Sequence, residues 1–270
     1  MQRKVVVITG SSDGIGAELA RQLARVHGSN LGLCLAARNQ EMLEQVAKQC
    51  RELGSDCLVV PTDVSDQEQC RQLINTTVAY FSRIDALINN AGKSAQALLS
   101  DVKDLSWYED LMRVNFWGSV WCTHAALPYL LQSKGCIVAV SSLAGLIGVP
   151  GRNAYSATKF AMNGFFEALR AEVKEAGVSV TIAYPGVVAT EIRYRGYNAD
   201  GIAAGSSGLK EDEAMSVEEC AGLIILGMEK RQRDVVMSVK GKLGRWLKLL
   251  LPGLVEKMAL AALKQEVRPH

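Results

Sequence analysis

The stretch KVVVITGSSDGIGAELARQLARV, residues 4–26, joins an apolar run to a glycine-rich turn and a helical pattern. The apolar run is continuous, as it is in strands that are buried on both faces of a sheet. Beyond the turn, one face of the predicted helix is apolar and carries Ile15, Leu19, Leu23 and Val26. The stretch therefore predicts a strand that leads through a tight turn into a helix.

The turn reads TGSSDGIG, residues 9–16, and has the glycine spacing G-x-x-x-G-x-G. Glycines permit a tight turn and let main-chain N–H groups approach a pyrophosphate, which then lies at the positive end of the helix dipole. The more common dinucleotide-binding spacing is G-x-G-x-x-G, and a glycine-rich connection without a ligand is the alternative interpretation. We interpret the turn as a pyrophosphate-binding loop.

Six further apolar runs follow, with intervals long enough for a helix between most of them: LGLCLAA from Leu31, DCLVVP from Asp56, DALIN from Asp85, CIVAVS from Cys136, VSVTIAY from Val178 and DVVMS from Asp234. Strands that alternate with helices form parallel sheets covered by helices on both faces. Capping boxes predict two helix starts, one at Ser65 with Glu68 and one at Ser216 with Glu219. The chain is therefore predicted to form a doubly wound parallel sheet.

The composition is that of an ordinary globular protein of 270 residues and 29.2 kDa, for which we expect a single domain. The formal net charge of +2 gives no bias toward nucleic acid as a partner. The seven cysteines are scattered without a C-x-x-C pattern, so we expect reduced thiols, no disulfide framework and no metal site. The amino-terminal residues lack the apolar core of a signal peptide, and charges interrupt the longest apolar stretch, Trp246 to Leu263. We expect a cytoplasmic protein without a membrane-spanning helix.

The end of the second predicted strand bears on the choice of cofactor. An acidic residue there would bind the adenosine ribose and favour NAD, but the sequence reads Ala37-Arg38. A guanidinium suits a 2′-phosphate because it makes bidentate, charge-assisted contacts. The residue favours NADP(H), and a solvated arginine at a helix start is the alternative.

Three side chains with acid-base or hydrogen-bonding chemistry are predicted to meet near the carboxyl ends of the strands. Ser142 follows the fifth strand, and a loop rich in Gly and Pro leads from it to Tyr155. Tyr155 and Lys159, in the sequence YSATK, are four residues apart and share one face of the predicted helix. The spacing by itself also occurs by chance on helices.

Six motifs in this order resemble those of the short-chain dehydrogenase/reductase family, over essentially the whole chain to about Met237. They are TGSSDGIG, NNAG from Asn89, VN with Asn115, SS with Ser142, YSATK and PG from Pro185. The resemblance, closest to the hydroxysteroid-dehydrogenase-like branch, implies a Rossmann fold with a seven-stranded sheet in the order 3-2-1-4-5-6-7. It also implies an enzyme in which a nicotinamide cofactor supplies the hydride chemistry.

The same resemblance implies roles for four residues of this chain. Tyr155 would be the general acid and base, and Lys159 would favour its phenolate and bind the nicotinamide ribose. Ser142 would hydrogen-bond the substrate oxygen, and Asn115 would help to hold a water that links Lys159 to solvent. The expected cofactor contacts, besides Tyr155 and Lys159, are Gly10, Ser12, Gly14, Ile15, Gly16, Arg38, Asp63, Val64, Asn89, Ala91, Pro185, Val188 and Thr190.

Some of these assignments have structural alternatives. Asn89 and Asn90 would serve equally as turn residues, and Asp63 as the cap of the following helix. The chain also departs from the family pattern at Asp13, because many NADP-using relatives carry Lys or Arg just before the second motif glycine. Arg38 would then bear the 2′-phosphate largely alone.

Two segments lie outside the regular alternation of strands and helices. Residues 190–215 are rich in Gly and charge, and we interpret them as a loop that is either a substrate lid or a plain insertion. Residues 241–270 form a basic amphipathic extension of the catalytic domain, residues 1–240. The extension would lie on a membrane surface, cover the substrate entrance or contact another subunit.

The predicted helix after Tyr155 has two stripes that favour burial. Ala157, Ala161, Gly164 and Ala168 form a small-residue stripe, and Met162, Phe166, Leu169 and Val173 form a bulky one. We expect the bulky stripe on the sheet and the small stripe at the interface of a homodimer or homotetramer.

The sequence as a whole predicts an NADP(H)-dependent enzyme that interconverts a ketone or aldehyde and an alcohol by hydride transfer. The resemblance favours a bulky apolar substrate, such as a steroid- or lipid-like carbonyl or alcohol. The alternative is a nucleotide-binding redox sensor or scaffold without turnover.

Overall fold

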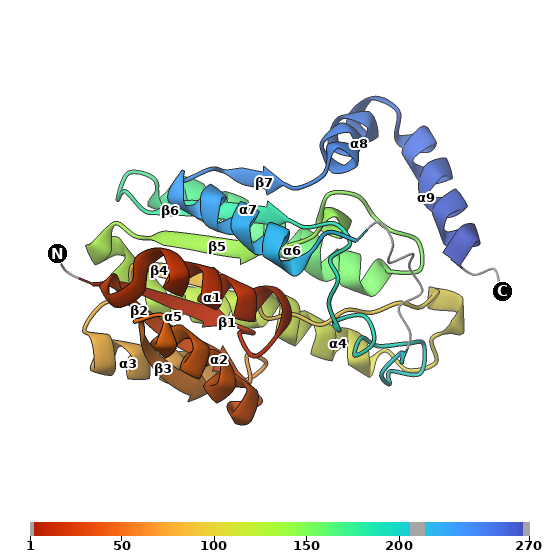
Figure 1. Ribbon diagram of the computed structural model, residues 1–270. Helices are drawn as coiled ribbons and strands as arrows, with labels where there is room; N and C mark the ends of the chain where they lie inside the picture. Colours follow the sequence, from red (N-terminus) through yellow and green to blue (C-terminus); the bar gives the residue numbers. More distant parts are fainter. Residues whose placement is uncertain (1–2, 206–213, 267–270) are drawn as a thin grey trace.

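The computed structural model describes residues 3–205 and 214–266. Seven parallel strands form one sheet in the order β3-β2-β1-β4-β5-β6-β7, which confirms the predicted fold (Figure 1). The strands are β1 (Lys4–Thr9), β2 (Leu31–Ala37), β3 (Asp56–Pro61), β4 (Ala86–Asn89), β5 (Cys136–Val140), β6 (Ser179–Tyr184) and β7 (Asp234–Val236).

Helices cover both faces of the sheet and enclose two apolar cores. One core contains residues of α1 (Gly14–His27), α2 (Gln40–Glu52) and α7 (Val217–Glu229). The other contains residues of α3 (Gln67–Phe81), α5 (Gly118–Ser133) and α6 (Asn153–Val173). The bulky stripe of α6 is buried in this second core, as predicted. Val26, predicted on the apolar face of α1, is exposed, because the last turns of α1 are buried through Ala20, Leu23 and Ala24 instead.

The strand register explains how continuous apolar runs serve both cores. A row of residues in register crosses the sheet on the face of α3, α5 and α6, and it consists of Cys34, Val7, Leu87, Ile137 and Val180. Their neighbours along each strand face the other core, because successive side chains alternate. Both sets must therefore be apolar.

The order of the strands reverses between β1 and β4. The chain runs outward from β1 to β3 and returns to β4, on the other side of β1. In open α/β sheets the loops on either side of such a switch point diverge and leave a crevice at the carboxyl ends of the strands. The glycine turn after β1 and the NNAG segment after β4 border this crevice.

One of the two predicted helix caps is confirmed and the other is wrong. Ser216 accepts a hydrogen bond from Glu219 N (3.0 Å) and caps α7. Asp66 rather than Ser65 caps α3, because its carboxylate accepts from both Glu68 N and Gln69 N. The Ser65 hydroxyl instead donates to Asp63 Oδ1 (2.7 Å).

Several segments lie outside the sheet and its covering helices and border the carboxyl ends of the strands. The segment 190–215, of which residues 206–213 lie outside the described ranges, has its ends joined by a bridge between Val188 and Met215. The remaining α-helices are α4 (Ser106–Met112), α8 (Val239–Leu250) and α9 (Pro252–Glu266), and a π turn (Arg113–Trp117) joins α4 to α5. The last two helices project from the body of the molecule (Figure 1). Within the described ranges, no helix combines the length and apolar character needed to cross a membrane.

Candidate active site

The glycine turn is packed so tightly that two of its glycines cannot be replaced without a clash. Gly10 has φ +67°, and a Cβ on it would lie 2.7 Å from Ala91 Cα. A Cβ on Gly16 would collide with the Gly10 carbonyl oxygen and lie 2.5 Å from Asn90 Nδ2. Main chain thus occupies the space that side chains would fill, which brings N–H groups to the surface of the crevice.

Asn90 holds the turn in this shape, a role that the sequence interpretation missed. Its Nδ2 donates to the carbonyl oxygens of Thr9 and Gly10, both at 3.0 Å. Thr9 Oγ1 in return accepts from the N–H groups of Asn90 and Ala91, both at 3.1 Å. These bonds join the ends of β1 and β4. The doubled asparagine in NNAG is the only signal of the brace in the sequence.

The first turn of α1 leaves its N–H groups available to an anion. Asp13 occupies the N-cap position, but its side chain makes no capping bond, whereas Asn39 caps α2 and Asp66 caps α3. The Asp13 carboxylate instead forms an ion pair with Arg195. Because uncapped N–H groups and the helix dipole favour negative charge, this end of α1 fits a pyrophosphate.

A buried serine ties the glycine turn to β2, and an exposed cation follows β2. Ser11 is buried and its Oγ accepts from Ala36 N (2.9 Å), which ties the glycine turn to β2. Ser12 stays half-buried and Arg38 is exposed. Burial lowers the pKa of Lys93, the Arg38 charge adds to this shift, and the carboxylates of Asp110 and Asp63 oppose it. Arg38 directly follows β2, at the carboxyl edge of the sheet that borders the crevice.

The side chains of Asn89, predicted at the ribose, and Asp63, predicted at the adenine, make hydrogen bonds within the protein. Asn89 Nδ2 donates to Thr123 Oγ1 of α5 (2.9 Å), whereas its buried Oδ1 has no hydrogen-bond partner among the described residues. Asp63 Oδ1 accepts from Ser65 N (2.9 Å) and shapes the loop before α3, and it does not cap that helix. Val64 is buried in the core below.

Tyr155 and Lys159 lie in the first turns of α6, and both are nearly covered by protein. Tyr155 is 9% exposed and Lys159 is 3% exposed. Lys159 Nζ donates to the carbonyl oxygen of Val140 at the end of β5 (2.9 Å) and lies 5.8 Å from the centre of the Tyr155 ring. Burial lowers the pKa of Lys159, while the negative charge of a Tyr155 phenolate would raise it.

Two side chains fix α6 against the end of β5. Ser141 Oγ donates to Asn163 Oδ1 (2.6 Å), and Asn163 Nδ2 donates to the carbonyl oxygen of Gly145 (2.8 Å). Ser142 lies between these anchors, and its Oγ accepts from Ala144 N (3.2 Å). The backbone that carries Ser142 is therefore held in a fixed position relative to α6.

Asn115 lies in the π turn and is fully buried. Its Oδ1 accepts from Lys93 N (2.7 Å), and its Nδ2 donates to Lys93 O (2.9 Å) and Thr158 Oγ1 (3.0 Å). The side chain thus joins the segment after β4 to α6. The π turn that carries Asn115 is a local irregularity of a kind that is frequent at functional sites.

The segment after β6 closes one side of the crevice. Pro185 O accepts from Leu143 N (3.0 Å), and Val188 is buried at the base of the segment. Thr190 Cγ2 would lie 3.3 Å from a Cβ on Gly14, so this residue contacts the glycine turn. Tyr197 N donates to Ser94 O (3.0 Å), which attaches the segment to the opposite wall.

Comparisons with known proteins agree with this arrangement. The profile of a family described as short chain dehydrogenase matches residues 4–199. The 11-beta-hydroxysteroid dehydrogenase 1A of Arabidopsis thaliana is 38% identical over 262 residues, which cover 94% of this chain and 73% of that protein. The dehydrogenase/reductase SDR family protein 7-like of Dictyostelium discoideum is 34% identical over 261 residues, 94% of this chain and 80% of that protein.

A solved structure shares the fold. It is described as an alcohol dehydrogenase from the archaeon Thermococcus sibiricus complexed with 5-hydroxy-NADP. The superposition has a TM-score of 0.75 and covers 87% of this chain and 96% of that chain, with 24% sequence identity. At this identity the likeness concerns the fold alone.

Proposed function

This chain belongs to the short chain dehydrogenase family of oxidoreductases that act on CH–OH groups, and on that premise we propose that it interconverts a ketone or aldehyde and an alcohol with NADP(H). The observation that carries the proposal is the placement of Tyr155 and Lys159 beside the end of β5. The glycine turn, with Gly10, Ser12, Gly14, Ile15 and Gly16, fits the pyrophosphate of such a cofactor. When bound, the nicotinamide supplies the hydride.

The residues of the chain would manage the proton and the orientation of the substrate. In the reducing direction, Tyr155 donates its phenolic proton to the carbonyl oxygen, and Ser142 Oγ hydrogen-bonds the same oxygen. In the oxidising direction, the Tyr155 phenolate removes the proton from the hydroxyl. An unperturbed tyrosine, with a pKa of about 10, is a poor base at neutral pH. The nearby ammonium of Lys159 favours the phenolate by charge attraction.

The other proposed cofactor contacts follow the walls of the crevice. Asp63 and Val64 would lie at the adenine, and Asn89 and Ala91 along the ribose. Pro185, Val188 and Thr190 would border the nicotinamide. We propose that Asn115 positions the active site by tying Lys93 to α6, because its side-chain amide is already hydrogen-bonded on both sides.

The proposed preference for NADP(H) rests on Arg38, and replacement of this residue tests it. Charge-assisted hydrogen bonds contribute about 1.5–3 kcal/mol, so Arg38→Gln should weaken NADPH binding on the order of tenfold or more and leave NADH binding nearly unchanged. The measurement is the consumption of NADPH and NADH by purified protein with carbonyls from small aldehydes to steroid and long-chain ketones. Turnover with NADH alone would contradict the cofactor assignment, and tight nucleotide binding without any turnover would support a sensor or scaffold.

A bulky apolar substrate is proposed because apolar side chains follow Ser142 along the chain. Leu143 and Ile147 lie after β5, and α8 covers them at close range through Gly241 and Gly244. The segment 190–215 is proposed as the lid of this site. Residues 1–240 would form the catalytic domain, with the extension 241–270 at its entrance. Relatives at 38% identity carry the name hydroxysteroid dehydrogenase, which supports the same substrate class.

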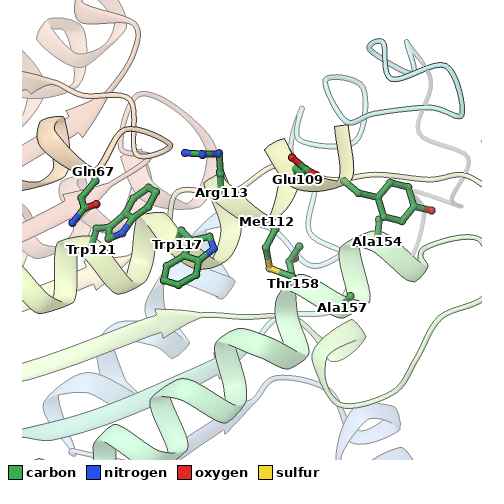
Figure 2. A pocket seen from close by; sticks show the side chains of 10 residues that line it. Gln67, Glu109, Met112, Arg113, Trp117, Trp121, Ala154, Ala157 and Thr158 are labelled. Carbon is green, nitrogen blue, oxygen red and sulfur yellow. The ribbon is translucent and has the colours of Figure 1, made fainter. Parts of the chain in front are cut away.

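We propose that the outer face of α6 joins a second copy of the chain, in a homodimer or homotetramer. Ala157, Gly164 and Ala168 of the small-residue stripe are exposed. Beside them lies a hollow of about 680 Å³, whose lining includes Ala157, Met112, Trp117 and Trp121 (Figure 2). An exposed small-residue stripe beside tryptophans, one of them 43% exposed, fits a helix of a partner subunit.

Replacement of Gly164 by Glu tests this interface. A Cβ on Gly164 meets no described atom within 4 Å, so the isolated subunit should fold normally. If α6 packs against α6 of a second subunit, the two new carboxylates would be buried in the interface without counter-charges. We therefore expect dissociation to monomers. Size-exclusion chromatography with light scattering measures the mass, and Gly253→Glu on α9, where a Cβ is equally free, serves as the control. An unchanged mass for Gly164→Glu would place the interface elsewhere.

We further propose that the projecting helices α8 and α9 contact a lipid surface. Val239, Leu243, Trp246 and Leu250 lie on one side of α8, and all are more than 60% exposed. Such a stripe with a tryptophan is typical of helices in the membrane interface. The free thiols of the cysteines fit a protein of the cytoplasm.

Vesicle flotation tests the lipid contact. The protein should float with vesicles of phosphatidylcholine and phosphatidylserine. The double variant Leu243→Ser/Trp246→Ser should reduce the bound fraction several-fold, because it removes two apolar side chains that would insert into the lipid. Leu99→Ser, at an exposed leucine remote from α8 in the sequence, is the control. Equal flotation of all three proteins, or none with the unsubstituted protein, would exclude the proposed surface.

A further inference from the structure

We propose that Arg195 selects the cofactor by supplying a second cation, after Arg38, at the 2′-phosphate of NADP(H). This inference rests on the proposed use of NADP(H). It assigns to Arg195, in the segment after β6, the role of a positive charge that the glycine turn of this chain lacks. The observation behind it is the ion pair between Arg195 and Asp13, two residues that are 182 positions apart.

Asp13 creates the need for such a residue. It precedes Gly14 at the start of α1, beside the loop that fits the pyrophosphate, and its side chain does not cap the helix. An uncompensated carboxylate at this place would repel a cofactor that carries several negative charges, and most strongly one with a further phosphate. Arg195 neutralises the carboxylate and brings a guanidinium to the same position.

The fold holds Arg195 near the glycine turn through anchors on both sides. Before it, Thr190 contacts Gly14. After it, Tyr197 donates its N–H to Ser94 O (3.0 Å) and accepts from Gln96 N (2.8 Å), and its ring covers the Lys93 ammonium at 3.3 Å. The chain between these anchors must cross the crevice, so the position of Arg195 does not depend on its ion pair alone.

The geometry of a guanidinium permits two anions at once. The ion pair with Asp13 uses Nη2 of Arg195, and a guanidinium carries five N–H donors in one plane. The side chain of Arg195 is also 58% exposed, which leaves it accessible to a ligand. Ser11 of the glycine turn accepts a hydrogen bond from Ala36 N near the end of β2 (2.9 Å). Asp13, the partner of Arg195, follows Ser11 by two residues, and Arg38 follows Ala36 by two, so both cations border the junction of the glycine turn with β2.

Equilibrium binding of NADPH and NADH, followed by nucleotide fluorescence, tests this assignment without reference to turnover. Arg195→Gln removes the positive charge and keeps an unbranched polar side chain. We expect the Kd for NADPH to rise about tenfold and the Kd for NADH to change less than about twofold. A similar rise for both nucleotides, or for neither, would overturn the inference and leave Arg195 as a structural contact of the lid.

The double variant Asp13→Asn/Arg195→Gln separates a direct contact from a masking effect. If Arg195 contacts the 2′-phosphate, the preference for NADPH stays reduced when Asp13 is also neutral. If the preference returns, Arg195 only masks Asp13 and the proposed contact is wrong.

Arg38→Gln distinguishes this inference from the broader function. If the unsubstituted protein shows no preference for NADPH, the NADP(H) proposal itself fails. If Arg38→Gln loses the preference while Arg195→Gln keeps it, only the role of Arg195 fails.

Discussion

Replacement of Tyr155 by Phe should reduce carbonyl turnover by about 10²–10⁴-fold, because it removes the proposed proton donor. The ring itself packs in a small apolar cluster with Trp107, Leu111 and Ala144, and phenylalanine preserves these contacts. The glycine turn and Arg38 are unaffected by the change. We therefore expect nucleotide binding within about twofold of the unsubstituted protein.

The control for this substitution is Tyr80→Phe. Tyr80 is an exposed tyrosine of α3, and its hydroxyl donates to Asp56 Oδ1 (3.1 Å), away from α6. Initial rates with NADPH and a saturating ketone, together with nucleotide titrations, measure both effects. If Tyr155→Phe retained more than about a tenth of the activity, a different group would have to supply the proton.

Replacement of Gly16 by Ala should strongly weaken nucleotide binding. On an ordinary helix this change would be favourable by about 1 kcal/mol, because alanine has the higher helix propensity. Here the added Cβ would collide with Gly10 O and lie 2.5 Å from Asn90 Nδ2. Relief of the clash must displace either the turn or its brace, at a cost of about 1–3 kcal/mol. We expect the Kd for NADPH to rise about 10- to 100-fold and the protein to lose stability.

Gly253→Ala is the matched control, because it lies in α9 and its Cβ would meet no described atom within 4 Å. Nucleotide fluorescence measures binding, and thermal unfolding measures stability. If Gly16→Ala bound NADPH as tightly as Gly253→Ala, the turn would not be the pyrophosphate site. A normal melting temperature with lost binding would place the whole effect in the site.

The fold could be predicted from the sequence because its signals are local. Each of the seven strands is a continuous apolar run, and each connection is long enough to return to the sheet. The cap of α3 could not be predicted in the same way, since Ser65 and Asp66 are adjacent and both carry acceptors. Asp66 caps the helix because its carboxylate accepts from two N–H groups at once.

The chemistry of the candidate site could be predicted in part. Tyr155 and Lys159 meet on one helix face, which follows from their spacing. Asn90 could not be identified as the brace of the glycine turn, because its partners Thr9 and Gly10 belong to another strand. Nor could the sequence show that the amide of Asn115 is occupied by Lys93 and Thr158.

The sequence by itself thus determined the strands, the helices and the residue types at the ends of the strands, because these depend on periodicity and on neighbours along the chain. The tertiary structure decided which of these ends meet. It places Lys159 on Val140 and Arg195 on Asp13. The physical reason is that the strand order and the segment after β6 bring together groups that lie far apart in the sequence and that no local pattern relates.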